Sequence, residues 1–180
     1  MLFLEASHIR LRANRLILKL ACDILKEVND FNTEKERYSM ADIRTTALKV
    51  IEKDKIGVMA TISANNKPQA RYMTFFNEGF MLFTMTDKRT SKVEDIKANP
   101  HAFVLLGYEE GLFNKNFVEI EAEVSISENQ SLIEHLWNPA MNAAFDGKDD
   151  PNILILKLTP NKVSVRGTKN AEVESVDLTE

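Results

Sequence analysis

Apolar and polar residues alternate most strictly in FVEIEAEVSI, residues 117–126, where three glutamates and a serine separate the apolar positions. A period of two predicts a strand with one buried and one solvated face. Shorter stretches rich in strand-forming residues predict six further strands, over 56–63, 69–76, 80–86, 101–108, 153–158 and 162–167. Segment 101–108 is apolar almost throughout, which predicts that it is buried on both faces.

Turn residues separate several of these segments and predict how they connect. ANNKP (64–68) and NEG (77–79) join the first three strands, and Thr-Pro-Asn (159–161) joins the last two. The first three strands are therefore expected to form an antiparallel meander, and the last two a hairpin.

A helical period appears in three places. Asp42 is the predicted N-cap of a helix after Met40, with an apolar stripe formed by Ile43, Ala47, Val50 and Ile51. A second helix begins near Thr90 and ends before Pro100, and a third covers 128–145 with an interruption near Pro139. Six or seven antiparallel strands with three short helices, and no βαβ alternation, predict a mainly β (α+β) protein with a closed or split β-barrel.

The chain divides into three predicted regions: an N-terminal extension (1–39), a barrel domain (40–167) and an acidic tail (168–180) that is expected to be loose. Residues 11–28 read as a basic amphipathic helix. That helix packs on the domain or a partner, or it touches a membrane surface. A third interpretation is that the extension is not native and that translation begins at Met40.

The composition and net charge of the chain limit the classes of function that we expect for it. The net charge of −4 disfavours a general nucleic-acid binder, and no apolar stretch is long enough to span a membrane. The single cysteine, Cys22, excludes an internal disulfide, and the three histidines show no metal-ligand spacing. We therefore expect a cytoplasmic protein without a metal site. No catalytic residue is assigned, because the common catalytic motifs are missing. A chain this poor in acid–base groups binds a ligand or takes its chemistry from a cofactor.

Two stretches could hold an anion. Arg71 lies within the strand RYMTFF, on the same face as Met73 and Phe75, and a guanidinium there needs an anion or an exposed position. The segment TDKRTSK (86–92) precedes a predicted helix, whose free N–H groups could hold a phosphate with Thr90, Ser91 and Lys92. Each stretch alone is more simply a solvated arginine or an ordinary helix start. Together, beside aromatic and methionine side chains, they suit a phosphorylated ring cofactor.

In order and spacing, these segments resemble the pyridoxamine 5'-phosphate oxidase-like FMN-binding split barrels, most closely the general stress protein branch. The resemblance covers about residues 42–166 and includes LWNP (136–139) and DDP (149–151). It implies a six-stranded split barrel and a homodimer with FMN at its interface. It also implies that Arg71, Thr90, Ser91 and Lys92 hold the FMN phosphate. The backbone of Tyr72, Met73 and Thr74 would follow the isoalloxazine ring, with Phe83 and Thr84 at the next strand end.

The sequence also departs from the family. Val165-Arg166 stands where the general stress branch often has an aromatic pair, and the C-terminal substrate-binding pattern of true pyridoxamine phosphate oxidases is absent. Pyridoxal phosphate synthesis is therefore not expected. The sequence favours an FMN-dependent oxidoreductase of the stress response, with NAD(P)H as a candidate electron donor. The alternatives are a module that binds or senses flavin without turnover and, third, a barrel for haem or a deazaflavin.

Overall fold

The computed structural model describes residues 25–26, 29, 42–107, 116–167 and 173–178. The chain divides into two compact units, Met1–Asp42 and Ile43–Glu180. Most of the predicted N-terminal helix, together with Met40, lies outside the described residues, although residues 25–26 are helical. No helix among the residues that the structure describes is long and apolar enough to cross a membrane.

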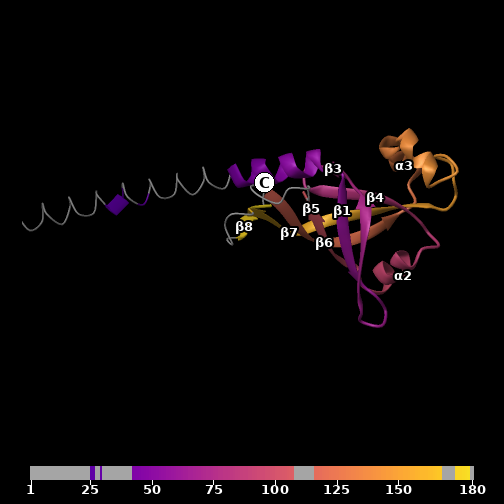
Figure 1. Ribbon diagram of the computed structural model, residues 1–180, viewed down its shortest axis with the longest axis horizontal. Helices are drawn as coiled ribbons and strands as arrows, with labels where there is room; N and C mark the ends of the chain where they lie inside the picture. Colours follow the sequence, from indigo (N-terminus) through magenta and orange to yellow (C-terminus); the bar gives the residue numbers. More distant parts are fainter. Residues whose placement is uncertain (1–24, 27–28, 30–41, 108–115, 168–172, 179–180) are drawn as a thin grey trace, which may run out of the picture. The chain divides into compact units, whose positions relative to one another are not determined.

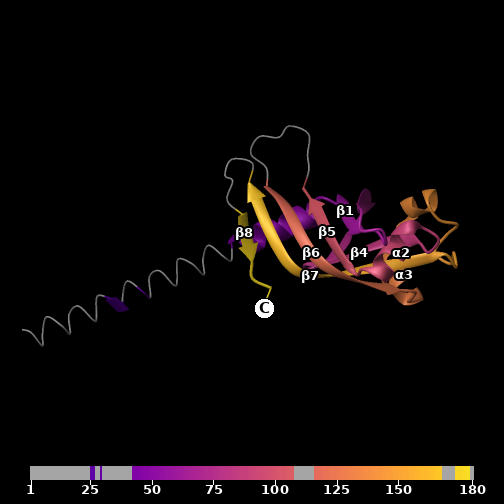
Figure 2. The same ribbon diagram turned by 90° about the horizontal axis from the view of Figure 1, so that it is seen from below.

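The second unit is built on one antiparallel sheet, which curls in Figures 1 and 2. Seven strands follow the order β2-β1-β5-β6-β7-β4-β3, and β8 pairs with β7. The strands are β1 (Ile56–Ile62), β2 (Pro68–Thr74), β3 (Phe76–Glu78), β4 (Met81–Asp87), β5 (His101–Leu106), β6 (Asn116–Ser127), β7 (Ile153–Gly167) and β8 (Val173–Val176). The predicted fold class, a mainly β split barrel with short helices, is confirmed, with eight strands among the described residues in place of six.

Three differences explain the strand count. The predicted strand 69–76 breaks at Phe75, so that β2 pairs with β1 and β3 pairs with β4. The predicted hairpin around 159–161 is wrong, because β7 runs through these residues and absorbs them in a register shift opposite Glu121 and Ala122. The acidic tail is not loose where it is described, because Val176 is buried in the core as part of β8.

The helices follow the sequence pattern closely. Residues 42–53 are helical, and Ala47 and Ile51 are buried in the main core. Asp42 is itself helical, so its predicted role as N-cap is wrong. Helix α2 (Ser91–Ala98) begins after Thr90, and the third predicted helix is interrupted as expected, as α3 (Gln130–Leu136) followed by the 3-10 helix η1 (Pro139–Ala143). Both views place α2 and α3 at the end of the sheet opposite β8 (Figures 1 and 2).

The core lies mainly on the concave side of the sheet, which we call the inner face. The alternation predicted for 117–126 is confirmed, because Val118, Ile120, Ala122 and Val124 are buried while the glutamates point outward. Strand β5 alternates too, and Phe103 is 38% exposed, so the prediction of burial on both faces is wrong. A second cluster joins β4 and β7 to α3 and contains Phe83, Met85, Ile133, Leu136, Ile153 and Ile155.

Candidate functional site

The sheet is left open along one edge of β2. The backbone N–H of Phe75 donates to the carbonyl of Lys55 at 2.7 Å, and this pair continues the register of β1 and β2 by one residue beyond Ile56 and Thr74. Hydrogen-bonded pairs alternate along an antiparallel ladder, so odd-numbered residues of β2 bond to β1. The N–H and C=O groups of Ala70, Tyr72 and Thr74 therefore point to the other side, where no described strand pairs with β2.

Strand β4 has a matching open edge. Strand β3 pairs only with Met81, Leu82 and Phe83, so Thr84–Asp87 has a neighbour on its β7 side alone among the described strands. We call these two unpaired edges, β2 and Thr84–Asp87, the split. The sequence-based expectation that β2 and β4 are hairpin neighbours is therefore wrong, and ligand-binding side chains can approach from both edges.

Arg71 lies on β2 opposite the fully buried Met59, so its side chain starts on the inner face. Its Nη1 donates to Thr61 Oγ1 at 2.8 Å. Its Nη2 lies 3.7 Å from Asp95 Oδ2 on α2, and the Arg71 side chain is 20% exposed. The guanidinium is thus mostly shielded from water and is held at the end of the sheet that α2 covers.

On the opposite edge, three polar side chains form a connected group at the start of α2. Lys92 Nζ donates to Thr86 Oγ1 at 2.9 Å, and that oxygen lies 3.2 Å from Thr90 Oγ1. The Thr90 hydroxyl donates to the backbone oxygen of Asp87 and makes no capping bond to α2, although Thr90 is the N-cap residue. In the part of the chain that is described, Lys92 bonds to a hydroxyl and forms no ion pair.

Lys92 and Arg71 bring two positive charges together. Burial lowers the pKa of Lys92, the nearby charge of Arg71 lowers it further, and Asp87 opposes both effects. A lysine whose charged form is disfavoured by burial and by a second cation gains most from an approaching anion. The arrangement can therefore attract an anionic group such as a phosphate monoester.

The three residues between Thr86 and Thr90 form a separate structure. Arg89 holds Asp87 through its side chain, with Nη2–Oδ2 at 2.5 Å, and Lys88 Nζ donates to the carbonyl of Pro151 at 2.8 Å. Hydrogen bonds from the Arg89 side chain and backbone lower the pKa of Asp87 to about 2. Lys88 and Arg89 are exposed, in line with the sequence-based view of a solvated turn.

An apolar groove of about 540 Å³ lies next to the split. Its lining is rich in methionine and phenylalanine and includes Lys55 as its one cation; the residues are Lys55, Tyr72, Met73, Thr74, Phe75, Phe76, Met85, Asn138, Ala140, Met141, Ala144 and Phe145. The predicted LWNP element contributes Asn138. A volume of this size suits a small-molecule ligand, and a mostly apolar wall with a few polar groups is typical of such sites.

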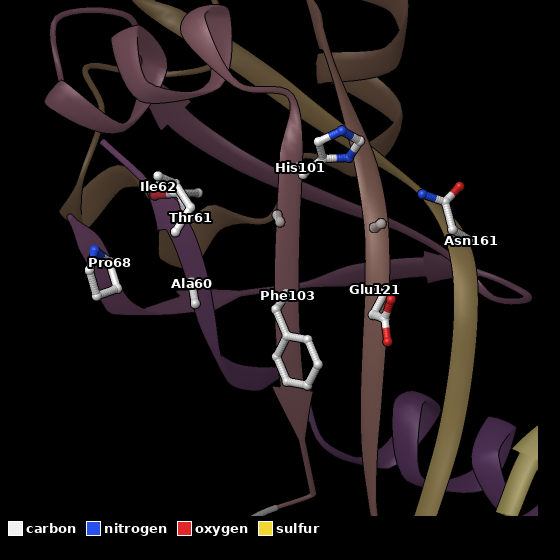
Figure 3. A pocket seen from close by; sticks show the side chains of 10 residues that line it. Ala60, Thr61, Ile62, Pro68, His101, Phe103, Glu121 and Asn161 are labelled. Atoms are coloured by element: carbon white, nitrogen blue, oxygen red, sulfur yellow. The ribbon is translucent and has the colours of Figure 1, made fainter. Parts of the chain in front are cut away.

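The outer face of the sheet, opposite the inner face, is unusually apolar around β1. Ile56, Ile62, Tyr72 and Phe103 are exposed there, and the strand register places them on one face. A hollow of about 360 Å³ lies on this face. Figure 3 shows side chains that line it, including Phe103 on β5 and Glu121 on the neighbouring β6. Exposed apolar side chains gathered in this way are typical of surfaces that contact another molecule.

The predicted site residues fall into three groups. Arg71, Thr90 and Lys92 converge at the split, while Ser91 is exposed at the start of α2. Tyr72, Met73 and Thr74 line the groove. Phe83 is not brought to either place, because it is buried in the second cluster. Thr84 is also buried, and its hydroxyl has no hydrogen-bond partner among the described residues.

Sequence reasoning missed Thr61 and Asp95. The alternation of β1 could have located Thr61, since it shares the inner face with Gly57 and Met59. Asp95 follows Lys92 by three residues on α2, which places both on neighbouring positions of one helix face. Asp95 is only 8% exposed, in a helix whose other buried residues are Val93 and Ile96, and this burial is a property of the fold that the sequence did not reveal.

The fold and sequence agree with known proteins. The family model described as pyridoxamine 5'-phosphate oxidase matches residues 43–167. General stress protein 26 of Bacillus subtilis (strain 168) is 36% identical over 137 residues, which covers 76% of this chain and 97% of that protein. The crystal structure of General Stress Protein 26 from Bacillus anthracis str. Sterne aligns with a TM-score of 0.65 at 28% identity, covering 74% of this chain and 98% of that one.

A likeness in fold alone extends further. A Clostridium acetobutylicum protein related to general stress protein 26 aligns with a TM-score of 0.63 at 19% identity, over 72% of this chain and 90% of that one. The matched region begins at Ile43 and ends at Gly167, so it coincides with the sheet from β1 to β7 and the helix that precedes it. This chain therefore belongs to the pyridoxamine 5'-phosphate oxidase-like family, in its general stress protein branch.

Proposed function

We propose that this protein binds FMN at the split and acts as a flavin-dependent oxidoreductase. The observation that carries the proposal is the convergence of Arg71 and Lys92, which approach from opposite edges of the split with no carboxylate paired to Lys92 among the described residues. Two half-buried cations fit a phosphate monoester, and the Thr90 hydroxyl would turn from the carbonyl of Asp87 to donate to it. The adjoining groove fits a flat, largely apolar ring system.

The open edge of β2 supports the same placement. The backbone groups of Tyr72 and Thr74 lack strand partners, and both residues line the groove. Unpaired backbone donors and acceptors are strong hydrogen-bonding groups, and the polar rim of a flavin ring offers both kinds of partner. Thr84, on β4, has a buried hydroxyl with no hydrogen-bond partner among the described residues. A ligand could supply that partner.

In this proposal the residues of the chain bind and orient, and the flavin supplies hydride transfer when it is bound. Arg71 and Lys92 would hold the phosphate, while Met73, Met85 and Phe145 would exclude water from one side of the ring. The described lining of the groove contains no carboxylate and no histidine. The protein would therefore contribute position and electrostatics, and no acid–base residue is assigned.

The test is binding followed by reduction. The full chain is purified and titrated with FMN and with riboflavin, which lacks the phosphate, and flavin fluorescence gives both dissociation constants. We expect FMN to bind at least tenfold more tightly than riboflavin. NADH and NADPH are then mixed with the FMN complex in a stopped-flow instrument, and bleaching of the flavin absorbance would show turnover. A protein that binds neither flavin would refute the proposal.

A second candidate is a module that holds flavin without turning it over. The lack of any carboxylate or histidine in the described groove lining favours it. It predicts the same preference for FMN, but neither NADH nor NADPH would reduce the bound flavin, so the flavin absorbance would not bleach. The stopped-flow experiment therefore separates the two candidates directly.

We also propose that a second copy of the chain covers the outer face of β1, β2 and β5, which would complete the FMN site at a dimer interface. Support comes from the four exposed apolar side chains on that face and from Tyr72, which belongs both to the face and to the groove. Phe103→Lys is expected to convert the dimer to a monomer in sedimentation experiments and to weaken FMN binding. A parent protein that sediments as a monomer would contradict this part of the proposal.

A further inference from the structure

Two buried residues flank Arg71 without lining the apolar groove. Thr61, on β1, is 2% exposed, and its hydroxyl accepts a hydrogen bond from Arg71 Nη1 at 2.8 Å. Asp95, on α2, is 8% exposed, and its Oδ2 lies 3.7 Å from Arg71 Nη2. The two ends of the guanidinium therefore face different groups, one neutral and one charged.

The two distances imply different effects on Arg71. At 2.8 Å the contact with Thr61 is a hydrogen bond, which fixes the orientation of the planar guanidinium. At 3.7 Å Asp95 is beyond hydrogen-bond distance, so it acts through its charge. Thr61 consequently directs Arg71, whereas Asp95 reduces the positive potential that an incoming anion would meet.

The charged side chains around Arg71 do not all favour tight binding of an anion. Arg71 and Lys92 contribute two positive charges, which are opposed by Asp95 at 3.7 Å from Arg71 and by the charge of Asp87 near Lys92. Asp95 is the one charged residue among the buried residues that the structure describes. A carboxylate in this position competes with a phosphate for Arg71, because both are attracted to the same guanidinium.

We infer that Thr61 and Asp95 are opposing positioning residues of the phosphate site. Thr61 increases phosphate affinity by orienting Arg71, and Asp95 lowers it by charge, so that FMN exchanges with the free pool. This inference rests on the proposed FMN function. It assigns to Asp95 a role in setting how readily the ligand leaves, and it identifies the ligand as dissociable.

The test compares Thr61→Val and Asp95→Asn, with Glu94→Gln as the matched control. Glu94 neighbours Asp95 on α2 but is exposed and paired with Lys97.

Dissociation constants for FMN and riboflavin are measured by fluorescence for the full chain. Thr61→Val is expected to weaken FMN binding roughly three- to tenfold, a smaller effect than loss of a direct contact, because Arg71 stays in place and loses only the hydrogen bond that orients it. Asp95→Asn is expected to tighten FMN binding about threefold or more. Riboflavin binding stays constant in both variants, and Glu94→Gln binds both flavins as the parent does.

The opposite signs keep the inference falsifiable. A variant that is merely destabilised binds FMN more weakly, and it does not bind more tightly, so a tighter Asp95→Asn complex that also releases FMN more slowly supports the inference. A folded Asp95→Asn protein that binds FMN as the parent does, or more weakly, overturns it. If Asp95→Asn does not fold, Asp95→Ser gives the same comparison. A parent protein without preference for FMN over riboflavin would instead refute the proposed phosphate site itself.

Discussion

Removing the Lys92 ammonium should separate recognition of the phosphate from recognition of the ring. In Lys92→Met the long apolar stem is kept, and the contact of Nζ with Thr86 Oγ1 is lost. A hydrogen bond to a charged group contributes about 1.5–3 kcal/mol, which corresponds to a roughly 10- to 150-fold weaker FMN complex. Riboflavin has no phosphate, so its affinity should remain within about twofold of the parent value.

The stability of the ligand-free protein should change little in the same variant, because two effects oppose each other. Loss of the hydrogen bond from the Lys92 ammonium to Thr86 destabilises the fold by about 1.5 kcal/mol, the lower end of the range for a charged group, because the bond is only partly buried. The lowered pKa of Lys92 shows that its charge is disfavoured in the folded state, so removing that charge is stabilising near pH 7. We expect a net change below about 1 kcal/mol, or a melting temperature within about 4 °C of the parent.

The assay is a fluorescence titration with both flavins, together with a thermal melt of the ligand-free protein. Lys97→Met is the matched control, since Lys97 lies on the same helix but is exposed and paired with Glu94. That variant should bind both flavins as the parent does. Equal losses for FMN and riboflavin in Lys92→Met would refute the reasoning, because they would place Lys92 at the ring or in the fold rather than at the phosphate.

Four further predictions follow from the same structure. Arg71→Ala should weaken FMN by about 1.5–3 kcal/mol and leave riboflavin unchanged in the same titration. The pKa of Lys92 lies below the ordinary lysine value of 10.5, so Lys92 should lose its charge, and the protein its preference for FMN over riboflavin, before the pH reaches 10.5. A preference that stays constant up to pH 10.5 would contradict this. Gly57→Ala should lower the free energy of unfolding in urea by about 1–3 kcal/mol, since its Cβ would lie 2.6 Å from the backbone oxygen of Leu105; an unchanged value would contradict this. Asp87→Asn should be less stable than the parent above about pH 4. The difference in melting temperature should vanish as the pH falls through about 2, because the pKa of Asp87 is depressed to about that value in the folded protein; a difference that does not change with pH would argue against this reasoning.

The strands could be predicted from the sequence where a single pattern, either alternation or an apolar run, marked them. The alternation of 117–126 placed β6 correctly, and the apolar runs located β1, β4 and β5 to within about two residues. The Thr-Pro-Asn stretch misled because its turn residues are also compatible with a bulge, which is where β7 shifts register against β6. Burial of β5 on both faces was a reasonable inference from composition, but Phe103 shows that an exposed surface can be as apolar in its residue types as a core.

The candidate site was predicted in part for a related reason. Arg71 stood out as a cation among apolar residues of a strand, and Lys92 stood out because it follows two hydroxyl residues at the start of a predicted helix. The alternation of β1 could have placed Thr61 on the inner face, but the roles of Thr61 and Asp95 became visible only in three dimensions, because they depend on distances to Arg71. Phe83 was proposed from the family resemblance alone, and the structure buries it in the second cluster.

The break at Phe75 explains why the phosphate residues and the groove lie next to each other. Phe75 makes the last bond of β2 to β1, through its N–H, and buries its side chain in the main core. The chain then turns to β3, where Phe76 pairs with Phe83 and so occupies only the first half of the β4 edge. A continuous strand over 69–76 that paired with β4 would close the barrel and use the backbone groups of Tyr72 and Thr74. Because the strand breaks, both edges stay available, with Arg71 before the break and the groove wall around it. The break therefore keeps open the region in which we place FMN.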